Sequence, residues 1–158
     1  MDGSVEIRPA GEHDRLPMAH LFAAVAGERD GIAAEPPIDA GKWAERWHLD
    51  GTFVAVEIGE IVGVVSVDPT PFGYGELGMF VGAGSRGRGV GTALVEAAID
   101  WSRANGLHKV TLGVFPHNDA AIALYRKFGF VDEGLRVEHI RRKNGELWDL
   151  LEMGLPLR

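Results

Sequence analysis

The sequence predicts a single domain of the α/β (α+β) class over residues 1–158, with helices packed on a mixed β-sheet. The chain has 158 residues, which fits one domain with a core of its own. Short runs rich in β-branched residues alternate with runs in which apolar residues recur at helical spacing. Hydrophobic residues make up 46% and charged residues 25% of the chain, as in soluble globular proteins.

Residues 5–67 carry the signals of a strand, two helices and a β-hairpin. In the first helix, Leu16, Ala19 and Phe22 recur at helical spacing. In the hairpin, two β-branched runs flank a predicted two-residue turn at Gly59-Glu60. The predicted elements are a strand over Val5–Pro9, helices over Glu12–Ala26 and Lys42–Leu49, and strands over Phe53–Ile58 and Ile61–Val67.

The second half of the chain alternates strands and helices with clear end signals. Gly106 is typical of a left-handed helix end, Asn118 of a helix N-cap and Gly129 of a helix stop. The predicted elements are strands over Glu76–Val81, Lys109–Val114, Val137–Ile140 and Trp148–Leu155, and helices over Thr92–Ala104 and Asn118–Phe128.

The composition excludes several classes of function. The chain has no cysteine, so disulfides, thiolate metal sites and a cysteine nucleophile cannot occur, and a cytoplasmic location is the default expectation. The beginning of the chain lacks the apolar run of a signal peptide, and no stretch approaches 18 apolar residues. We therefore expect no membrane partner and no metal site.

The negative charge is concentrated in the first half of the chain. The formal net charge is -7, and residues 1–75 hold 5 Lys+Arg against 13 Asp+Glu. This excess argues against nucleic acid as a partner and would suit a cationic small molecule. An acidic surface that only keeps the protein soluble would give the same balance.

A glycine-rich loop stands between the strand ending at Val81 and the helix that follows. Residues 85–91 read SRGRGVG. Free backbone N–H groups converge at a helix N-terminus, and the helix dipole favours an anion there. Glycines let the backbone approach such an anion, and Arg86 and Arg88 can add positive charge. A tight turn without a ligand would show the same pattern.

Two nucleotide-binding motifs match this loop only in part. Residues 82–87 satisfy the G-x-G-x-x-G dinucleotide pattern, but the next strand is followed by Phe115 where an acidic residue should bind a ribose. A Walker loop would require lysine at Arg88 and serine or threonine at Gly89. We reject both motifs.

The loop resembles the pyrophosphate-binding loop of the GNAT superfamily of N-acetyltransferases. Arg86–Gly91 matches the family pattern Q/R-x-x-G-x-G/A, with Val81 five residues upstream. The run NDAAIALYRKFGF at 118–130 is similar to the second family motif, N-x-x-A-x-x-x-Y-x-x-x-G-F. The two motifs follow one another in the family's order, and the looser strand order covers the whole chain.

The resemblance implies a mixed, mostly antiparallel sheet with a central splayed parallel strand pair and flanking helices. The splayed strands would be Glu76–Val81 and Lys109–Val114, with the pantetheine of acetyl-CoA between them. It also implies a set of residues that would bind acetyl-CoA, namely Met79, Phe80, Val81, Arg86, Gly87, Arg88, Gly89, Val90, Gly91, Thr92, Asn118, Ala121 and Tyr125.

The reaction implied by the resemblance is direct attack of an amine on the acetyl thioester. The Met79 N–H would polarise the thioester carbonyl. Glu76 is the candidate for accepting the proton of the amine, because some amine-acetylating members carry glutamate there. His117 is a second candidate. Other members place an acid late in the preceding strand, where this chain has Gly113.

The family match makes Tyr125 the candidate for protonating the departing CoA thiolate. A phenol stays protonated at pH 7 and can donate a proton. Ala121, Tyr125 and Phe128 share one helix face, so a core role for Tyr125 would fit the spacing equally well. Trp43 and Trp47 also have helical spacing, which favours a place in the core over a substrate cage.

The sequence therefore predicts an enzyme that moves an acetyl group from acetyl-CoA to a primary amine. The ending GELWDLLEMG at 145–154 resembles members that acylate small amines and amino acids, and loop 27–41 is expected to shape the acceptor pocket. Two alternatives stay open: a non-catalytic acyl-CoA-binding regulatory domain, or an acetyltransferase of protein N-termini with an open groove over that loop. The expected partners are acetyl-CoA and an amine, with a homodimer left open.

Overall fold

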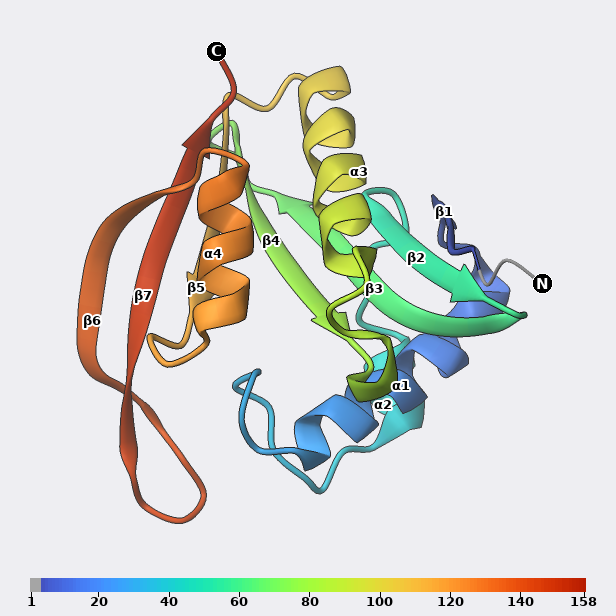
Figure 1. The fold of residues 1–158 in the computed structure, drawn as a ribbon, viewed down its shortest axis with the longest axis horizontal. Helices are drawn as coiled ribbons and strands as arrows, with labels where there is room; N and C mark the ends of the chain where they lie inside the picture. The colour runs from blue at the N-terminus through green and yellow to red at the C-terminus, as the bar shows by residue number, and fades with distance from the viewer. Residues whose placement is uncertain (1–3) are drawn as a thin grey trace.

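The computed structural model describes residues 4–158, and its seven-stranded β-sheet has helices on both faces (Figure 1). The strand order is β1-β2-β3-β4-β5-β7-β6. The strands are β1 (Glu6–Pro9), β2 (Thr52–Glu57), β3 (Glu60–Pro69), β4 (Tyr74–Val81), β5 (Lys109–Val114), β6 (Val131–Arg141) and β7 (Leu147–Pro156). The predicted fold class, a mixed and mostly antiparallel sheet with flanking helices, is confirmed.

The helices form two layers on opposite sides of the sheet. Together with two 3₁₀ segments, Glu12–Asp14 and Ala83–Ser85, they are α1 (Arg15–Gly27), α2 (Ala40–Ala44), α3 (Val90–Ala104) and α4 (Asp119–Lys127). Buried side chains of α3 and α4 join one core with the sheet, and those of α1 join a second core. The sheet thus presents two chemically separate faces.

The predicted splay is present at the centre of the sheet. β4 and β5 run parallel and pair at only three positions, from Tyr74 with Lys109 to Glu76 with Thr111. Beyond Glu76, β4 pairs only with β3, up to its end at Val81. β5 likewise pairs only with β7 beyond Thr111. The two strands therefore diverge and leave a gap between their carboxyl ends (Figure 1).

The core on the α1 side is built around aromatic rings. The ring of Phe22 lies 4.4 Å from Trp43, 6.0 Å from Trp47 and 5.4 Å from Phe80, centroid to centroid. Aromatic rings at these separations attract one another beyond the area they bury. Both tryptophans are partly buried and pack against this core, which agrees with the prediction of a packing role.

The predicted second helix, Lys42–Leu49, is wrong, because only Ala40–Ala44 is helical. The Arg15 guanidinium donates hydrogen bonds to the carbonyls of Ala44 and Trp47, at 3.0 and 2.8 Å. In a continued helix these carbonyls would accept from N–H groups four residues on. A long-range contact of this kind leaves no local signal in the sequence.

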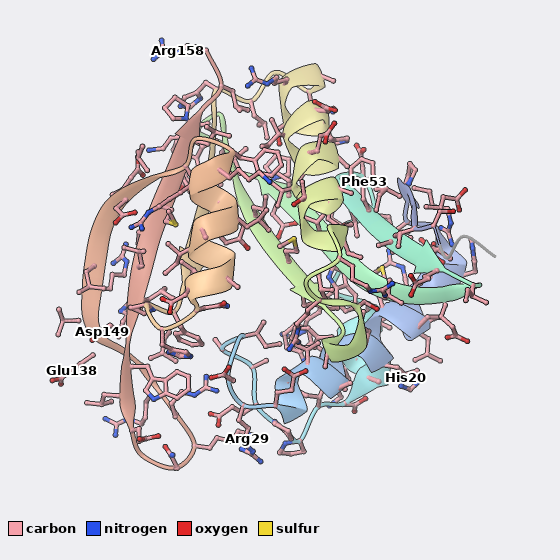
Figure 2. The ribbon with its side chains drawn as sticks, in the orientation of Figure 1. His20, Arg29, Phe53, Glu138, Asp149 and Arg158 are labelled. Atoms are coloured by element: carbon pink, nitrogen blue, oxygen red, sulfur yellow. The ribbon has the colours of Figure 1, made fainter. Side chains whose placement is uncertain are left out.

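The predicted hairpin turn and one strand also need correction. The turn is Ile58-Gly59 rather than Gly59-Glu60, and both of its residues have positive φ, at 50° and 75°. β6 begins at Val131 rather than Val137, because its exposed edge position removes the alternation that would mark a strand. Its register shifts near Glu138, whose N–H donates to the Asp149 carboxylate at 2.7 Å (Figure 2).

Candidate active site

The glycine-rich loop joins the end of β4 to the start of α3. Gly87 and Gly89 have φ of 75° and 84°, a left-handed conformation that favours glycine. Gly89 is the N-cap of α3 and provides no side-chain cap, so the helix begins at Val90 rather than at the predicted Thr92. The first N–H groups of α3 therefore stay available to an external acceptor.

At Gly91 glycine is favoured for a different reason, because neighbouring side chains pack closely against its backbone. A Cβ built on Gly91 would lie 3.0 Å from Leu124 Cδ2 and 3.6 Å from Met79 Cε. α3 thus approaches β4 and α4 at this residue. By contrast, no heavy atom lies within 4 Å of a Cβ built on Gly87 or Gly89. The space around these two residues is open, which fits an extended phosphate group.

Both arginines of the loop are already paired with glutamates. Arg86 binds Glu28 through two hydrogen bonds of 2.8 and 3.0 Å. Arg88 binds Glu57 in the same manner, at 2.7 and 2.8 Å, and these bonds lower the pKa of the Glu57 carboxyl. The sequence analysis treated the two arginines as free positive charge. In the structure each charge is balanced by a carboxylate.

Tyr125 lies on α4 inside the core of the α3 and α4 face. Its side chain is 6% exposed, and its ring packs 5.6 Å from that of Phe130. Burial raises the pKa of the Tyr125 hydroxyl to about 12, so the group is neutral at physiological pH. Within residues 4–158 the hydroxyl has no hydrogen-bond partner. A buried phenol with an unused donor is therefore available there.

Asn118 is the N-cap of α4, as predicted. Its side-chain oxygen accepts a hydrogen bond from the Ala121 N–H at 3.3 Å. At the other end of the helix, Gly129 has a φ of 99° and the Phe130 N–H donates to the Tyr125 carbonyl at 3.1 Å. These two ends fix the rotation of α4 and thereby the direction of Tyr125.

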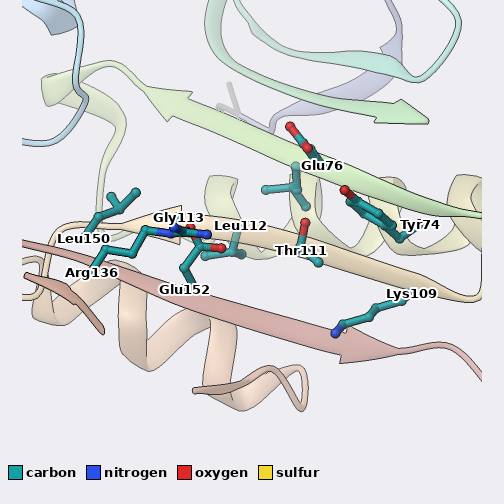
Figure 3. A pocket seen from close by; sticks show the side chains of 10 residues that line it. Tyr74, Glu76, Lys109, Thr111, Leu112, Gly113, Arg136, Leu150 and Glu152 are labelled. Carbon is teal, nitrogen blue, oxygen red and sulfur yellow. The ribbon is translucent and has the colours of Figure 1, made fainter. Parts of the chain in front are cut away.

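Glu76 lies on the other side of the sheet. It alternates along β4 with Leu77, which is buried in the α3 and α4 core, so its side chain points toward the opposite face. There it lines a cavity of about 450 Å³ (Figure 3). The lining residues are Tyr74, Glu76, Leu77, Lys109, Thr111, Leu112, Gly113, Arg136, Leu150 and Glu152.

The cavity carries both signs of charge. Arg136 forms an ion pair of 2.7 Å with Glu152, whereas Glu76 has no hydrogen bond or ion pair within the described residues. The sequence analysis missed Arg136 and Glu152. A signal existed, because Glu152 and Leu150 are two residues apart and so share one face of β7, and Glu152 is in register with Gly113 of β5. That signal becomes readable only once the order of the strands is known.

Two other sequence candidates lie in different surroundings. A Cβ on Gly113 would lie 3.0 Å from Leu150 Cδ2, so an acidic side chain there would require Leu150 to shift. His117 is not in the lining of the cavity; its Nε2 lies 3.0 Å from Asp30 Oδ1 and its ring stacks on Phe115 at 5.7 Å. Glu76 is therefore the sequence-predicted base that faces the cavity.

Residues 4–158 contain no helix long and apolar enough to cross a membrane. In the same range, no group of three or more His, Asp or Glu side chains is arranged to hold a metal ion. Glu76, Tyr125 and the backbone of the glycine-rich loop remain the predicted site residues.

Comparison with known proteins places this geometry in a family. Residues 19–130 match the model of the acetyltransferase (GNAT) family. The chain is 31% identical to the L-methionine sulfoximine/L-methionine sulfone acetyltransferase of Pseudomonas aeruginosa, over 98% of this chain and 95% of that protein. It is 29% identical to the phosphinothricin N-acetyltransferase of Streptomyces coelicolor, over 97% and 96%.

A solved structure agrees with these relatives. The crystal structure of the ribosomal-protein-alanine N-acetyltransferase from Brucella melitensis superposes with a TM-score of 0.86 at 30% identity, over 96% of this chain and 99% of that one. These proteins are named as enzymes, which speaks against the alternative of a non-catalytic binding domain. The chain belongs to the GNAT family and is an acetyl-CoA-dependent N-acetyltransferase.

Proposed function

We propose that the acceptor is a small zwitterionic amine of the amino-acid class, bound in the cavity beside Glu76. The observation that carries this proposal is the pair of opposite charges in one cavity, the unpaired Glu76 carboxylate and the Arg136 guanidinium, which binds Glu152 through Nε and keeps its Nη groups unpaired within the described residues. The first suits an ammonium group and the second a carboxylate. By their names, two relatives acetylate amino-acid analogues, which supports the same class.

Glu76 would take the proton that the acceptor must lose. An α-ammonium group has a pKa of about 8, so most of it is protonated at pH 7 and cannot attack. Glu76 is exposed to the cavity and stands at the last paired position before the strands part. A carboxylate there lies on the path of an acceptor that enters the gap between β4 and β5.

Tyr125 would donate the proton that the leaving thiolate needs. Acetyl-CoA supplies the acetyl group as an activated thioester. Because burial raises the pKa of Tyr125 to about 12, its hydroxyl keeps its proton throughout the neutral pH range. The Tyr125 O–H forms no hydrogen bond to another protein group within residues 4–158, so it is available to donate to the thiolate. Acid and base would thus work from opposite faces of the sheet.

The remaining predicted residues would hold acetyl-CoA. The amides from Gly87 to Thr92 would bind the pyrophosphate, with the left-handed turns at Gly87 and Gly89 presenting them. The backbone of Met79, Phe80 and Val81 would pair with the pantetheine, because this part of β4 has no partner on the side of the splay. Asn118, Ala121 and Tyr125 would line the other side of the arm.

A second candidate acceptor is the N-terminus of a protein. The likeness to the ribosomal-protein-alanine N-acetyltransferase favours it. It would need an open groove over loop 27–41, but Lys143 Nζ donates to the Pro36 carbonyl at 2.6 Å and its N–H to Glu35 at 2.8 Å. These bonds across the loop support the smaller acceptor. The lack of cysteine supports a cytoplasmic location, which is part of this proposal.

The acceptor class can be tested with pairs of matched amines. With acetyl-CoA, wild-type enzyme should acetylate amino acids with a higher kcat/KM than the same amines lacking the carboxylate. Arg136→Met should raise the KM of the zwitterion by roughly tenfold and leave that of the plain amine unchanged. Arg126→Met, at an exposed ion pair on α4, is the control. Equal use of both amines by wild-type enzyme would contradict the proposal.

The cofactor loop can be tested at Gly89. Gly89→Glu should abolish acetyl-CoA binding, because a carboxylate would occupy the position of the phosphate at the helix N-terminus. Gly84→Glu puts the same charge at an exposed loop glycine without positive φ and should bind nearly normally. Calorimetry measures both, with thermal unfolding as the check on folding. Unchanged affinity in Gly89→Glu would show that the loop is only a turn.

Glu76 can be tested by the pH dependence of the rate. Glu76→Gln should cut kcat by roughly 10²–10⁴ and alter the acidic limb of the pH–rate profile, while acetyl-CoA affinity stays the same. Glu96→Gln, an exposed glutamate on α3, should match the wild type. A normal rate and profile in Glu76→Gln would assign the proton to water or to His117.

Tyr125 can be tested by removing one oxygen atom. Tyr125→Phe keeps the ring in its packing, and the hydroxyl has no protein partner to lose, so the unfolding free energy should change by less than about 1 kcal/mol. kcat should fall by roughly 10²–10⁴ with little change in the Kd of acetyl-CoA. A stable variant with near-normal kcat, measured where chemistry limits the rate, would make Tyr125 a core residue only.

A further inference from the structure

Residues 28–36, which we name the strap, follow α1 and cross the wide end of the splay. At the β4 side, Glu28 binds Arg86 of the glycine-rich loop at 2.8 Å. Past the end of β5, Asp30 Oδ1 lies 3.0 Å from His117 Nε2. The strap begins near Arg29 in Figure 2 and runs toward the β6–β7 hairpin. It therefore spans the ends of both splayed strands.

Arg142 binds the strap from the β6–β7 hairpin. Its backbone is fixed by the hairpin turn, where its N–H donates to the Glu146 carbonyl at 2.8 Å. Its Nη1 donates to the carbonyl of Ala33 at 3.0 Å and, more weakly, to that of Ile32 at 3.4 Å. The side chain is only 2% exposed, and its Nε lies 3.7 Å from Glu35 Oε2. The contact is thus directed at the strap backbone.

An aromatic wall fixes the plane of the Arg142 guanidinium. The group lies 4.3 Å from the ring centre of Trp148 and 5.4 Å from that of Phe115. Cation–π stacking of this kind orients an arginine strongly once it is removed from water. Arg142 Nη2 is itself buried from solvent and has no hydrogen-bond partner within residues 4–158.

These features fit a positioning role better than a stabilising one. Burying a guanidinium with a carboxylate at 3.7 Å and two unused N–H groups on Nη2 gains little stability, and apolar replacement of such pairs is often neutral. What the arrangement does provide is a fixed place for two strap carbonyls. A polar group kept at this expense in stability indicates a geometric requirement.

The wall and the proposed acceptor cavity share one face of the sheet. Trp148 is two residues from Leu150 on β7. Phe115 follows the end of β5 at Val114, and its ring packs 4.9 Å from that of Trp148. Residues two apart on a strand point to the same side, so the wall continues the lining formed by Leu150 and Gly113. An acceptor that extends from Glu76 toward the wide end of the splay would meet the strap.

We propose that Arg142 is a positioning residue that sets acceptor specificity by holding the strap at the wide end of the splay. The strap residues Ile32 and Ala33 then limit the length of the acceptor's side chain. The inference rests on the proposed placement of the acceptor beside Glu76. It assigns to the β6–β7 hairpin a part in choosing the acceptor, separate from the binding of acetyl-CoA.

The first test compares Arg142→Met with the control Arg141→Met, whose side chain is exposed beside it. With the amine that wild-type enzyme uses best, Arg142→Met should raise the acceptor KM roughly ten- to a hundredfold, because the strap is no longer held in place. The Kd of acetyl-CoA should stay within about twofold, and the preference among amino acids of increasing length should flatten. An unchanged KM and an unchanged length preference would overturn the proposal.

A second pair of variants separates positioning from folding. Arg142→Met/Glu35→Gln removes both charges and keeps an acceptor for the Lys143 N–H, so thermal stability should return toward the wild type. The acceptor KM should stay high, since the bonds to Ile32 and Ala33 are still missing. Arg142→Lys, which can bind one carbonyl, should give an intermediate KM. Recovery of KM together with stability in the double variant would show a structural role only.

The two sets of variants distinguish a failure of the proposed acceptor site from a failure of the proposed role of Arg142. If Glu76→Gln leaves the rate unchanged while Arg142→Met still raises the acceptor KM, then Glu76 is not the base, but the proposed role of Arg142 and the strap still holds. If Glu76→Gln lowers kcat and Arg142→Met has no effect on KM or length preference, the cavity is correctly placed and the strap does not limit it.

Discussion

The parting of β4 and β5 after three paired positions is the constraint on which the rest of the structure depends. Each strand is held on its outer side, β4 by β3 and β5 by β7, so neither can turn back to close the gap. The gap leaves backbone N–H and C=O groups unpaired in the middle of a sheet, which is unfavourable unless something binds them. In the proposed binding mode, the amide groups of the pantetheine of acetyl-CoA would offset that cost.

The two faces of the sheet on either side of the splay offer different environments, one apolar and one polar. The face under α3 and α4 is apolar, and there burial raises the pKa of Tyr125 to about 12. On the other face Glu76 stands in a polar cavity with Arg136 and Glu152. One group is kept protonated by its surroundings, and the other stays exposed and polar. In the proposed mechanism, the gap is what would let two such groups act on one reacting centre.

The parts of the site that could be predicted from the sequence are those that depend on short-range signals. Glycines with positive φ, the Asn118 cap and the Gly129 stop act within a few residues, so the loop and α4 were readable. Contacts between distant segments were not. Arg142 meets Ala33 across 109 residues, and Arg15 ends α2 from 29 and 32 residues away. Arg136 and Glu152 were missed, because it is the order of the strands that places them around a cavity.

Because the loop arginines are paired with glutamates, their positive charge alone cannot explain how this acidic protein would bind a polyanion. The chain carries a net charge of -7, and Glu28 and Glu57 balance Arg86 and Arg88 beside the loop. Long-range attraction would therefore contribute little. The phosphates would instead be held by directed N–H groups at the start of α3, whose interactions fall off within one helical turn. Recognition then depends on the backbone geometry that Gly87 and Gly89 permit, and not on a surplus of positive charge.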